Sequence, residues 1–245
     1  MVQGYVRRHL ARGMARVMVW LAAALMLVAT QVAAEALQPD PAWLEGRLDN
    51  GLHWQILNTP QRPNDRIELR LLVRTGSLQE RPEQAGYAHF LEHMAFNGTA
   101  RFPEQAIRDL WQQAGLTFGD DLNASTEYDN TLYRISLPAD KPQLLTPALT
   151  WLSDVAGGLS LQPAQVSAER GVILGESLTR DKNQRSAHQQ WWDYQIKGSA
   201  LAKHDPIGEA EVINSATRER LQAFYRQWYT PDAMTLLISG NVDAR

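Results

Sequence analysis

The chain has 245 residues, of which 44% are hydrophobic and 21% charged, so it can bury a core and does not have the composition of a disordered protein. Its 24 Lys and Arg against 27 Asp and Glu give a net charge of −3, and without a basic stripe a nucleic-acid partner is not expected. The absence of cysteine excludes disulfides, a thiol nucleophile and thiolate metal ligands.

Residues 1–36 have the pattern of a cleaved secretory signal. Arginines without any acid precede the uninterrupted apolar run Val17–Thr30, and small residues follow it at Ala33-Ala34. The alternative is an uncleaved membrane anchor, but the run is shorter than the ~20 residues that span a bilayer. We therefore predict a periplasmic or secreted protein that has no membrane attachment after cleavage. The predicted mature domain, residues 37–245, is more acidic than the whole chain.

The first half of this domain contains patterns for a hairpin, a strand and a helix. Asn50-Gly51 lies between two short runs with strand character, and Asn-Gly favours a tight hairpin because it accepts positive φ. Apolar residues alternate over 67–73, which predicts a strand with one buried face. Apolar residues recur at helical spacing from Gly86 to Phe96, and Asn97-Gly98 is a plausible helix end.

The second half alternates between helical and strand patterns. Helices are predicted from Pro103 to Gly115, from Lys141 to Ala156, from Pro163 towards Ile196 and from Thr217 to Tyr229, and strands at 133–137 and 234–239. Strands that neighbour one another, together with helices in runs, predict a mainly antiparallel sheet covered by helices. The expected fold class is therefore α+β.

The strongest functional pattern is H-F-L-E-H at 89–93. Residues four apart share one face of a helix, so His89 and His93 can direct both imidazoles at one metal ion. Glu92 lies at the edge of that face, where its carboxylate could activate a zinc-bound water. The alternative is a chance pair of neutral histidines packed on a helix, but the apolar flanking residues and the predicted helix favour a zinc (Zn2+) site.

Two histidines leave a catalytic zinc one protein ligand short. Glu169 and Glu176 lie two helical turns apart in E-R-G-V-I-L-G-E, so they face the same way. A solvated acidic face is the usual fate of such a pair. Gly171 and Gly175, which each cost a helix about 1 kcal/mol, favour close approach by another helix instead. The spacing alone does not show which glutamate is the third ligand.

These motifs together resemble the pitrilysin/insulinase family of zinc metallopeptidases, which carry the inverted H-x-x-E-H motif. The resemblance rests on H-F-L-E-H-M-A-F-N-G-T, on N-A-S-T at 123–126, on E-R-G-V-I-L-G-E and on the closing W-Y-T-P-D-A-M-T-L-L-I-S-G-N-V. The resemblance covers about residues 45–243. The sequence of these motifs is most similar to a periplasmic bacterial branch that includes a pyrroloquinoline-quinone-associated zinc protease.

The resemblance implies roles that the spacing leaves open. It makes Glu176 the third zinc ligand and Glu169 a catalytic-site residue that orients and tunes the metal centre. It makes Glu92 the base of a zinc-dependent endopeptidase. It also implies that Asn123 and Ala124 lie on a strand that pairs with an extended peptide or unfolded protein substrate.

The chain also departs from the family pattern. His93 and Glu176 are 83 positions apart, several more than is usual, which suggests a small insertion near residues 157–165. Members of the family use a second, homologous half to close over the substrate, so a second half or partner subunit is expected. The alternative function is a non-catalytic or partner-dependent half that binds zinc or peptide.

The remaining histidines and an aromatic cluster have simpler explanations. His188 and His204 are expected to be surface or packing residues, because isolated histidines seldom bind metal. Trp191, Trp192 and Tyr194 are expected in the core or at a domain interface, as is usual for aromatic residues on helices.

Overall fold

The structure, a computed structural model, describes residues 38, 40–61, 64–182 and 187–242. The side chains of 180–189 are not described, and the predicted signal at 1–36 lies outside the described residues. Residues 41–245 form one compact unit. Among the described residues, no helix has the length and apolar character needed to cross a membrane.

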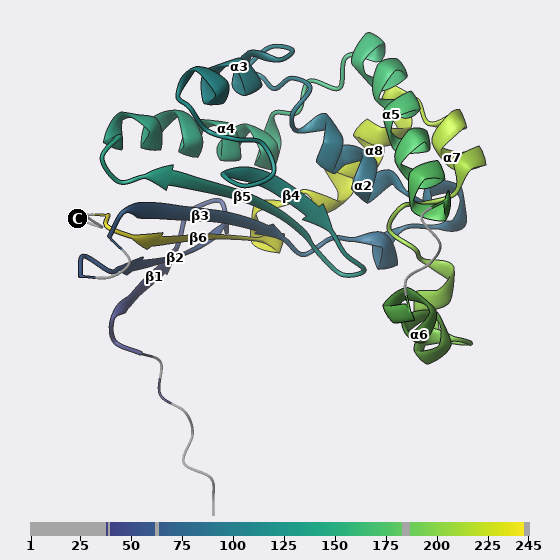
Figure 1. Cartoon of the computed structure of the whole chain (residues 1–245), viewed down its shortest axis with the longest axis horizontal. Helices are drawn as coiled ribbons and strands as arrows, with labels where there is room; N and C mark the ends of the chain where they lie inside the picture. The colour runs from purple at the N-terminus through teal and green to yellow at the C-terminus, as the bar shows by residue number, and fades with distance from the viewer. Residues whose placement is uncertain (1–37, 39, 62–63, 183–186, 243–245) are drawn as a thin grey trace, which may run out of the picture. The chain divides into compact units, whose positions relative to one another are not determined.

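A six-stranded sheet forms the base of this unit (Figure 1). In chain order its strands are β1 (Trp43–Arg47), β2 (His53–Asn58), β3 (Arg66–Val73), β4 (Leu122–Thr126), β5 (Thr131–Pro138) and β6 (Met234–Gly240). Their order across the sheet is β1-β2-β6-β3-β5-β4. Every pairing is antiparallel except that of β2 with β6, which lie far apart in the sequence and so have room for the long connection that a parallel pair needs.

The helices of the described residues are α2 (Tyr87–Met94), α3 (Ala106–Gln113), α4 (Leu145–Gly157), α5 (Pro163–Lys182), α6 (Ala187–Ile196), α7 (Ala210–Ser215) and α8 (Arg218–Trp228). In Figure 1, α2, α3, α4 and α5 lie on one side of the sheet. Strands β3 and β5 alternate between buried and half-buried residues and turn their apolar positions into a common core. The predicted α+β class with a mainly antiparallel sheet is therefore confirmed.

The predicted hairpin is present between β1 and β2. Gly51 has φ +96°, which an L-residue with a side chain rarely adopts, and the Asn50 side chain accepts a hydrogen bond from the Leu52 amide.

Three helical predictions need correction or refinement. The helix expected to begin at Pro103 begins at Ala106, because Glu104 has φ +49° and a left-handed residue cannot lie inside a right-handed helix. The stretch expected from Pro163 towards Ile196 takes the form of α5 and α6, on either side of residues 183–186. Helix α7 was not predicted, because six residues are too few for a clear apolar period.

Helix α2 is buried at every position except His93, which is half-buried. The carboxylate of Glu80 accepts hydrogen bonds from the amides of Gly86 and Ala88, at 2.8 and 2.7 Å. These are among the backbone donors that a helix leaves without an internal partner at its N-terminus. Glu80 therefore fixes the start of the helix that carries the H-x-x-E-H motif.

Candidate metal centre

The two histidines of the motif converge at one point. They lie one helical turn apart on α2, and their Nε2 atoms are 3.1 Å apart. The rings meet edge to face, with centroids 4.6 Å apart and planes at 81°. Two imidazole nitrogens directed at the same point are suited to sharing a metal ion.

Glu176 reaches this point from α5. Its Oε2 lies 3.6 Å from Nε2 of His89 and 3.5 Å from Nε2 of His93. Four ligand atoms arranged tetrahedrally around zinc, with bonds of about 2.0–2.1 Å, lie roughly 3.3 Å from one another. The three observed separations therefore fit three corners of a zinc site. Over the described ranges, His89, His93 and Glu176 form the only cluster of three or more possible metal ligands.

Glu169 approaches the opposite edge of the His93 ring. Its Oε1 accepts a hydrogen bond from Nδ1 of His93 at 2.7 Å, and its Oε2 accepts one from Nδ2 of Asn97. When Nδ1 donates to a carboxylate, Nε2 is directed towards the metal with its lone pair available. Burial opposes ionisation of Glu169, but His93, Asn97 and Arg108 together hold its pKa below the ordinary value.

His93 is surrounded by carboxylates. Burial alone would lower the pKa of its imidazole, but the hydrogen bonds to Glu169 and Glu176 outweigh burial and raise that pKa to about 9. A ligating histidine must be neutral at the nitrogen that binds, so metal binding here displaces a proton.

Glu92 is buried beside the same centre, with 8% of its surface exposed. Its Oε2 accepts a hydrogen bond from the Thr126 hydroxyl at 2.6 Å. Burial raises the pKa of the Glu92 carboxyl, and Glu176 adds to the rise, while the Thr126 hydrogen bond and His93 oppose it. A carboxylate with a raised pKa near a metal site is suited to accepting and returning a proton.

Asn123 and Ala124 lie on β4, which is at the end of the sheet and pairs along its length with β5. At its first residue, Leu122, β4 also bridges Phe118 in the preceding turn, and the Leu122 carbonyl accepts a hydrogen bond from the Gly119 amide. The amide of Ala124 donates to the side-chain oxygen of Asn123 at 2.9 Å. After Leu122, strand β4 thus has an open edge beside the motif helix, where an extended chain could add.

Asn97 and Thr126 are contacts of the site that the sequence did not reveal. The sequence places Asn97 at a helix end and within the extended H-x-x-E-H motif, but it does not indicate that the Asn97 amide donates to Glu169. Thr126 was part of the N-A-S-T pattern, but nothing in that pattern showed that its hydroxyl would meet Glu92. Both are short polar residues whose roles depend on contacts distant in sequence.

The other candidates lie away from this centre. His204 packs against Ser77, with its Nδ1 2.7 Å from the Ser77 carbonyl oxygen, as expected for a packing residue. The side chain of His188 lies outside the described residues. Trp191 and Tyr194 are 55% and 75% exposed, so the expectation of a core position is wrong for both, whereas the alternative of a domain interface stays a prediction. Trp192 donates to the Tyr128 hydroxyl.

More than half of the chain matches a known family. Residues 56–204 match the family described as Insulinase (Peptidase family M16). The chain belongs to the insulinase family. The resemblance seen in the sequence motifs is thereby confirmed. Residues 215–245 match a second description, Peptidase M16 inactive domain.

Two curated relatives and one crystal structure show how far the similarity extends. Protein YhjJ of Salmonella typhimurium is 44% identical over 92% of this insulinase-family chain and 45% of its own length. The probable zinc protease PqqL of Escherichia coli is 35% identical over 91% of the chain and 24% of its own length. The crystal structure of the periplasmic protease PqqL from Escherichia coli superposes with a TM-score of 0.79, at 34% identity, over 86% of this chain and 23% of that one. The chain therefore spans half or less of the length of these relatives.

Proposed function

We propose that this chain is the zinc-binding half of a periplasmic endopeptidase, and that it cleaves extended peptides or unfolded proteins with Glu92 as the general base. The observation that carries the proposal is the position of Glu92: a buried carboxylate held by Thr126 on the edge strand, beside three side chains whose ligand atoms fit a zinc ion. The relatives support zinc and peptide-bond hydrolysis, because PqqL is described as a zinc protease and its crystal structure as that of a periplasmic protease.

In this proposal His89, His93 and Glu176 hold the zinc. When bound, zinc polarises the scissile carbonyl and lowers the pKa of a coordinated water. Glu92 takes a proton as water adds to the carbonyl carbon, and returns it to the amine that leaves when the C–N bond breaks. Thr126 orients the Glu92 carboxylate, and Glu169 keeps His93 in the tautomer that directs Nε2 to the metal.

Strand β4 supplies the binding surface for the peptide backbone. An extended substrate would add to its free edge at Asn123 and Ala124, where backbone hydrogen bonds give affinity with little demand on sequence. The Asn123 side chain, which now accepts from the Ala124 amide, would turn away when that amide pairs with the substrate.

A second half or partner subunit is part of the proposal. The chain covers 45% of YhjJ and 24% of PqqL, and those proteins have further sequence that could cover the metal centre. Glu176 has 49% of its side chain exposed, so this side of the centre is open in the chain alone. Periplasmic localisation is supported by the signal-like residues 1–36 and by the periplasmic location of PqqL.

The test combines zinc content with cleavage of an unstructured peptide, for the chain alone and for the chain mixed with the remaining part of a full-length relative. Glu92→Gln is expected to keep stoichiometric zinc and lose cleavage, whereas Glu176→Gln is expected to lose zinc. Full activity of Glu92→Gln would refute the assignment of Glu92 as the general base. Stoichiometric zinc in Glu176→Gln would refute the assignment of Glu176 as the third zinc ligand. Zinc binding without cleavage, both by the chain alone and in the mixture, would instead favour a non-catalytic half that binds zinc or peptide.

A further inference from the structure

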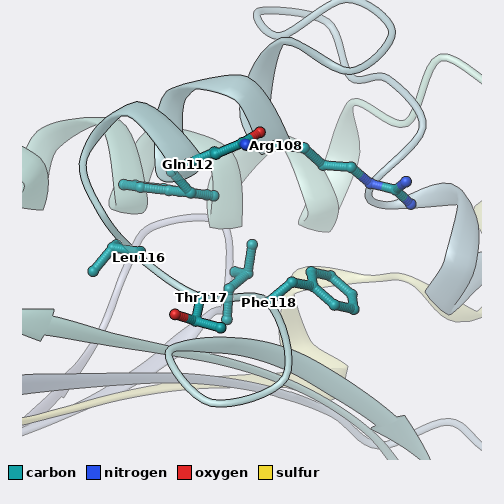
Figure 2. Close-up of a pocket in the computed structure, with 7 residues that line it drawn as sticks. Arg108, Gln112, Leu116, Thr117 and Phe118 are labelled. Atoms are coloured by element: carbon teal, nitrogen blue, oxygen red, sulfur yellow. The ribbon is translucent and has the colours of Figure 1, made fainter.

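A cavity lies on the same side of the sheet as the metal-binding helix α2 (Figure 1). It has a volume of about 530 Å³, within the range of small-ligand pockets, and Figure 2 shows it between α3 and the turn that leads into β4. Its lining residues are Arg108, Trp111, Gln112, Leu116, Thr117, Phe118 and Leu122. Arg108 also helps to keep the pKa of Glu169 low, and the other lining residues have no part in the mechanism above.

The cavity has an apolar floor and a cationic rim. Trp111, Leu116 and Leu122 are each less than 10% exposed, whereas Phe118 forms a wall that is 58% exposed. The Arg108 guanidinium lies 5.9 Å from the centre of the Phe118 ring, and in Figure 2 the two side chains extend in the same direction. Neither the Trp111 Nε1 nor the Arg108 Nε has a hydrogen-bond partner within the described part of the chain.

The turn that forms the wall is held firmly. Asp121 accepts a hydrogen bond from the Thr117 amide at 2.9 Å and forms an ion pair with Arg66 on β3. The Phe118 ring packs edge to face on Phe96, with centroids 5.2 Å apart, just beyond the end of the metal-binding helix. The cavity is therefore preformed, and its wall touches the segment that follows the H-x-x-E-H motif.

Strand geometry connects this cavity to the proposed substrate path. Thr126 turns its side chain to the helix side of the sheet, where it meets Glu92. Side chains two apart along a strand share a face, so Ala124 and Leu122 turn to that side as well. Leu122 lines the cavity and lies four residues, roughly 13 Å, along β4 from Thr126. Because the turn at Phe118 and Gly119 occupies the outer edge of β4 at Leu122, a peptide paired as far as Ala124 would pass next over this turn and the cavity.

We propose that this cavity is a specificity subsite that receives one large apolar or aromatic side chain of the extended peptide bound along β4, and that Arg108 disfavours lysine and arginine there. This subsite depends on the proposed peptide binding at β4. Because β-strand side chains alternate between faces, the preference is confined to one position of the peptide. That position lies about four residues from the residue opposite Thr126, and its immediate neighbours point to the other face of the sheet.

The test measures binding separately from cleavage. Full-length zinc-loaded Glu92→Gln protein is titrated with fluorescent peptides of alanine and serine in which a single phenylalanine is moved one position at a time. We expect one position at which phenylalanine binds roughly tenfold more tightly than alanine, with the gain lost when it moves by one residue. Lysine at that position is expected to bind no better than alanine.

Variants assign the preference to the cavity. Phe118→Ala, made in the Glu92→Gln chain, should reduce the preference to about twofold or less while the all-alanine peptide binds as before. Phe118→Leu should retain part of the preference. Arg108→Glu should make lysine favoured at the same position. Tyr194→Ala, which removes an exposed aromatic ring from α6, is the matched control and should leave the preference unchanged. Unfolding midpoints verify that each variant is folded.

The outcomes separate this inference from the proposed function. Equal affinity for phenylalanine and alanine at every position, or a preference that survives in folded Phe118→Ala, would overturn the subsite. A position-specific binding preference without cleavage by the wild-type chain plus its second half would leave the subsite standing and refute the endopeptidase. Cleavage without any positional preference would support the endopeptidase and refute the subsite. If no peptide bound at all, both proposals would be refuted.

Discussion

Replacing Glu80 by glutamine tests whether a buried charge at the start of the metal-binding helix makes stability depend on pH. Glu80 is 5% exposed and accepts hydrogen bonds from the Gly86 and Ala88 amides. Burial raises the pKa of its carboxyl from 4.5 to about 7, although those backbone hydrogen bonds act in the opposite direction. A carboxyl whose pKa is higher in the folded chain favours folding when protonated.

The sign and size of the effect follow from this pKa. The contribution of Glu80 to stability is fully present below pH 4.5 and is lost as the pH rises through about 7. The difference between 4.5 and about 7 corresponds to on the order of 3 kcal/mol in the free energy of unfolding, and little screening by solvent is expected at so buried a position. Glutamine has nearly the same shape and does not ionise, so Glu80→Gln should lack this loss.

The assay is urea unfolding of zinc-loaded wild-type and Glu80→Gln chains between pH 4.5 and 8. The stability of the wild type relative to the variant is expected to fall by on the order of 3 kcal/mol across this interval. The difference between the free energies of unfolding of the two proteins cancels the contributions of the other titrating groups. Glu83→Gln, at a solvent-exposed neighbouring position, is the control and should follow the wild type.

A difference that stays constant with pH, or one in which the wild type gains on the variant as the pH rises, would refute this reasoning. It would mean that the amides at the N-terminus of α2 hold Glu80 ionised strongly enough to overcome burial. The helix dipole acts in that direction, so the experiment decides between two opposing physical effects.

Three further predictions concern the metal centre and its base. Thr126→Val removes a hydrogen bond that favours ionised Glu92, so the acidic limb of the cleavage profile should move to higher pH, while Thr126→Ser should not shift it. Glu169→Gln should weaken zinc binding by about 10- to 100-fold, measured by competition with a chelating dye, because His93 loses the carboxylate that orients it. Zinc removal should lower the unfolding midpoint, and titrating zinc back to about 100 times its Kd should restore about 2.7 kcal/mol, whereas Glu176→Gln should show no such gain.

Local patterns predicted much of the fold. The alternation over 67–73 and the Asn50-Gly51 turn correspond to β3 and to the β1–β2 hairpin, because each depends only on neighbouring residues. The order of the strands was not predictable in this way: β6, from the far end of the chain, lies between β2 and β3. Pairings between distant segments depend on how the whole sheet closes its core, and no local period records them.

In the candidate site, too, the features set by neighbouring residues were predictable, and the contacts between distant segments were not. The spacing within H-x-x-E-H places His89 and His93 on one face of α2, and the structure has their Nε2 atoms 3.1 Å apart. The contacts that hold the motif in place come from elsewhere: Thr126 from the edge strand and Asn97 from the loop after α2. Glu80 at the start of α2 was equally inconspicuous, because a glutamate six residues before a glycine carries no helix-capping signature.

The two glutamates of α5 show why spacing alone left the third ligand open. Seven residues of helix rise about 10.5 Å, so Glu169 and Glu176 approach the same imidazole from two levels, one at each nitrogen of His93. Both oxygens of Glu169 already accept hydrogen bonds, from His93 and from Asn97, and it could bind the metal only by giving up at least one of them. Glu176 places one oxygen within 3.6 Å of both Nε2 atoms. A metal at that point is within reach of Glu176 while the contacts that orient His93 stay intact, and this supports Glu176 as the ligand and Glu169 as the residue that holds it.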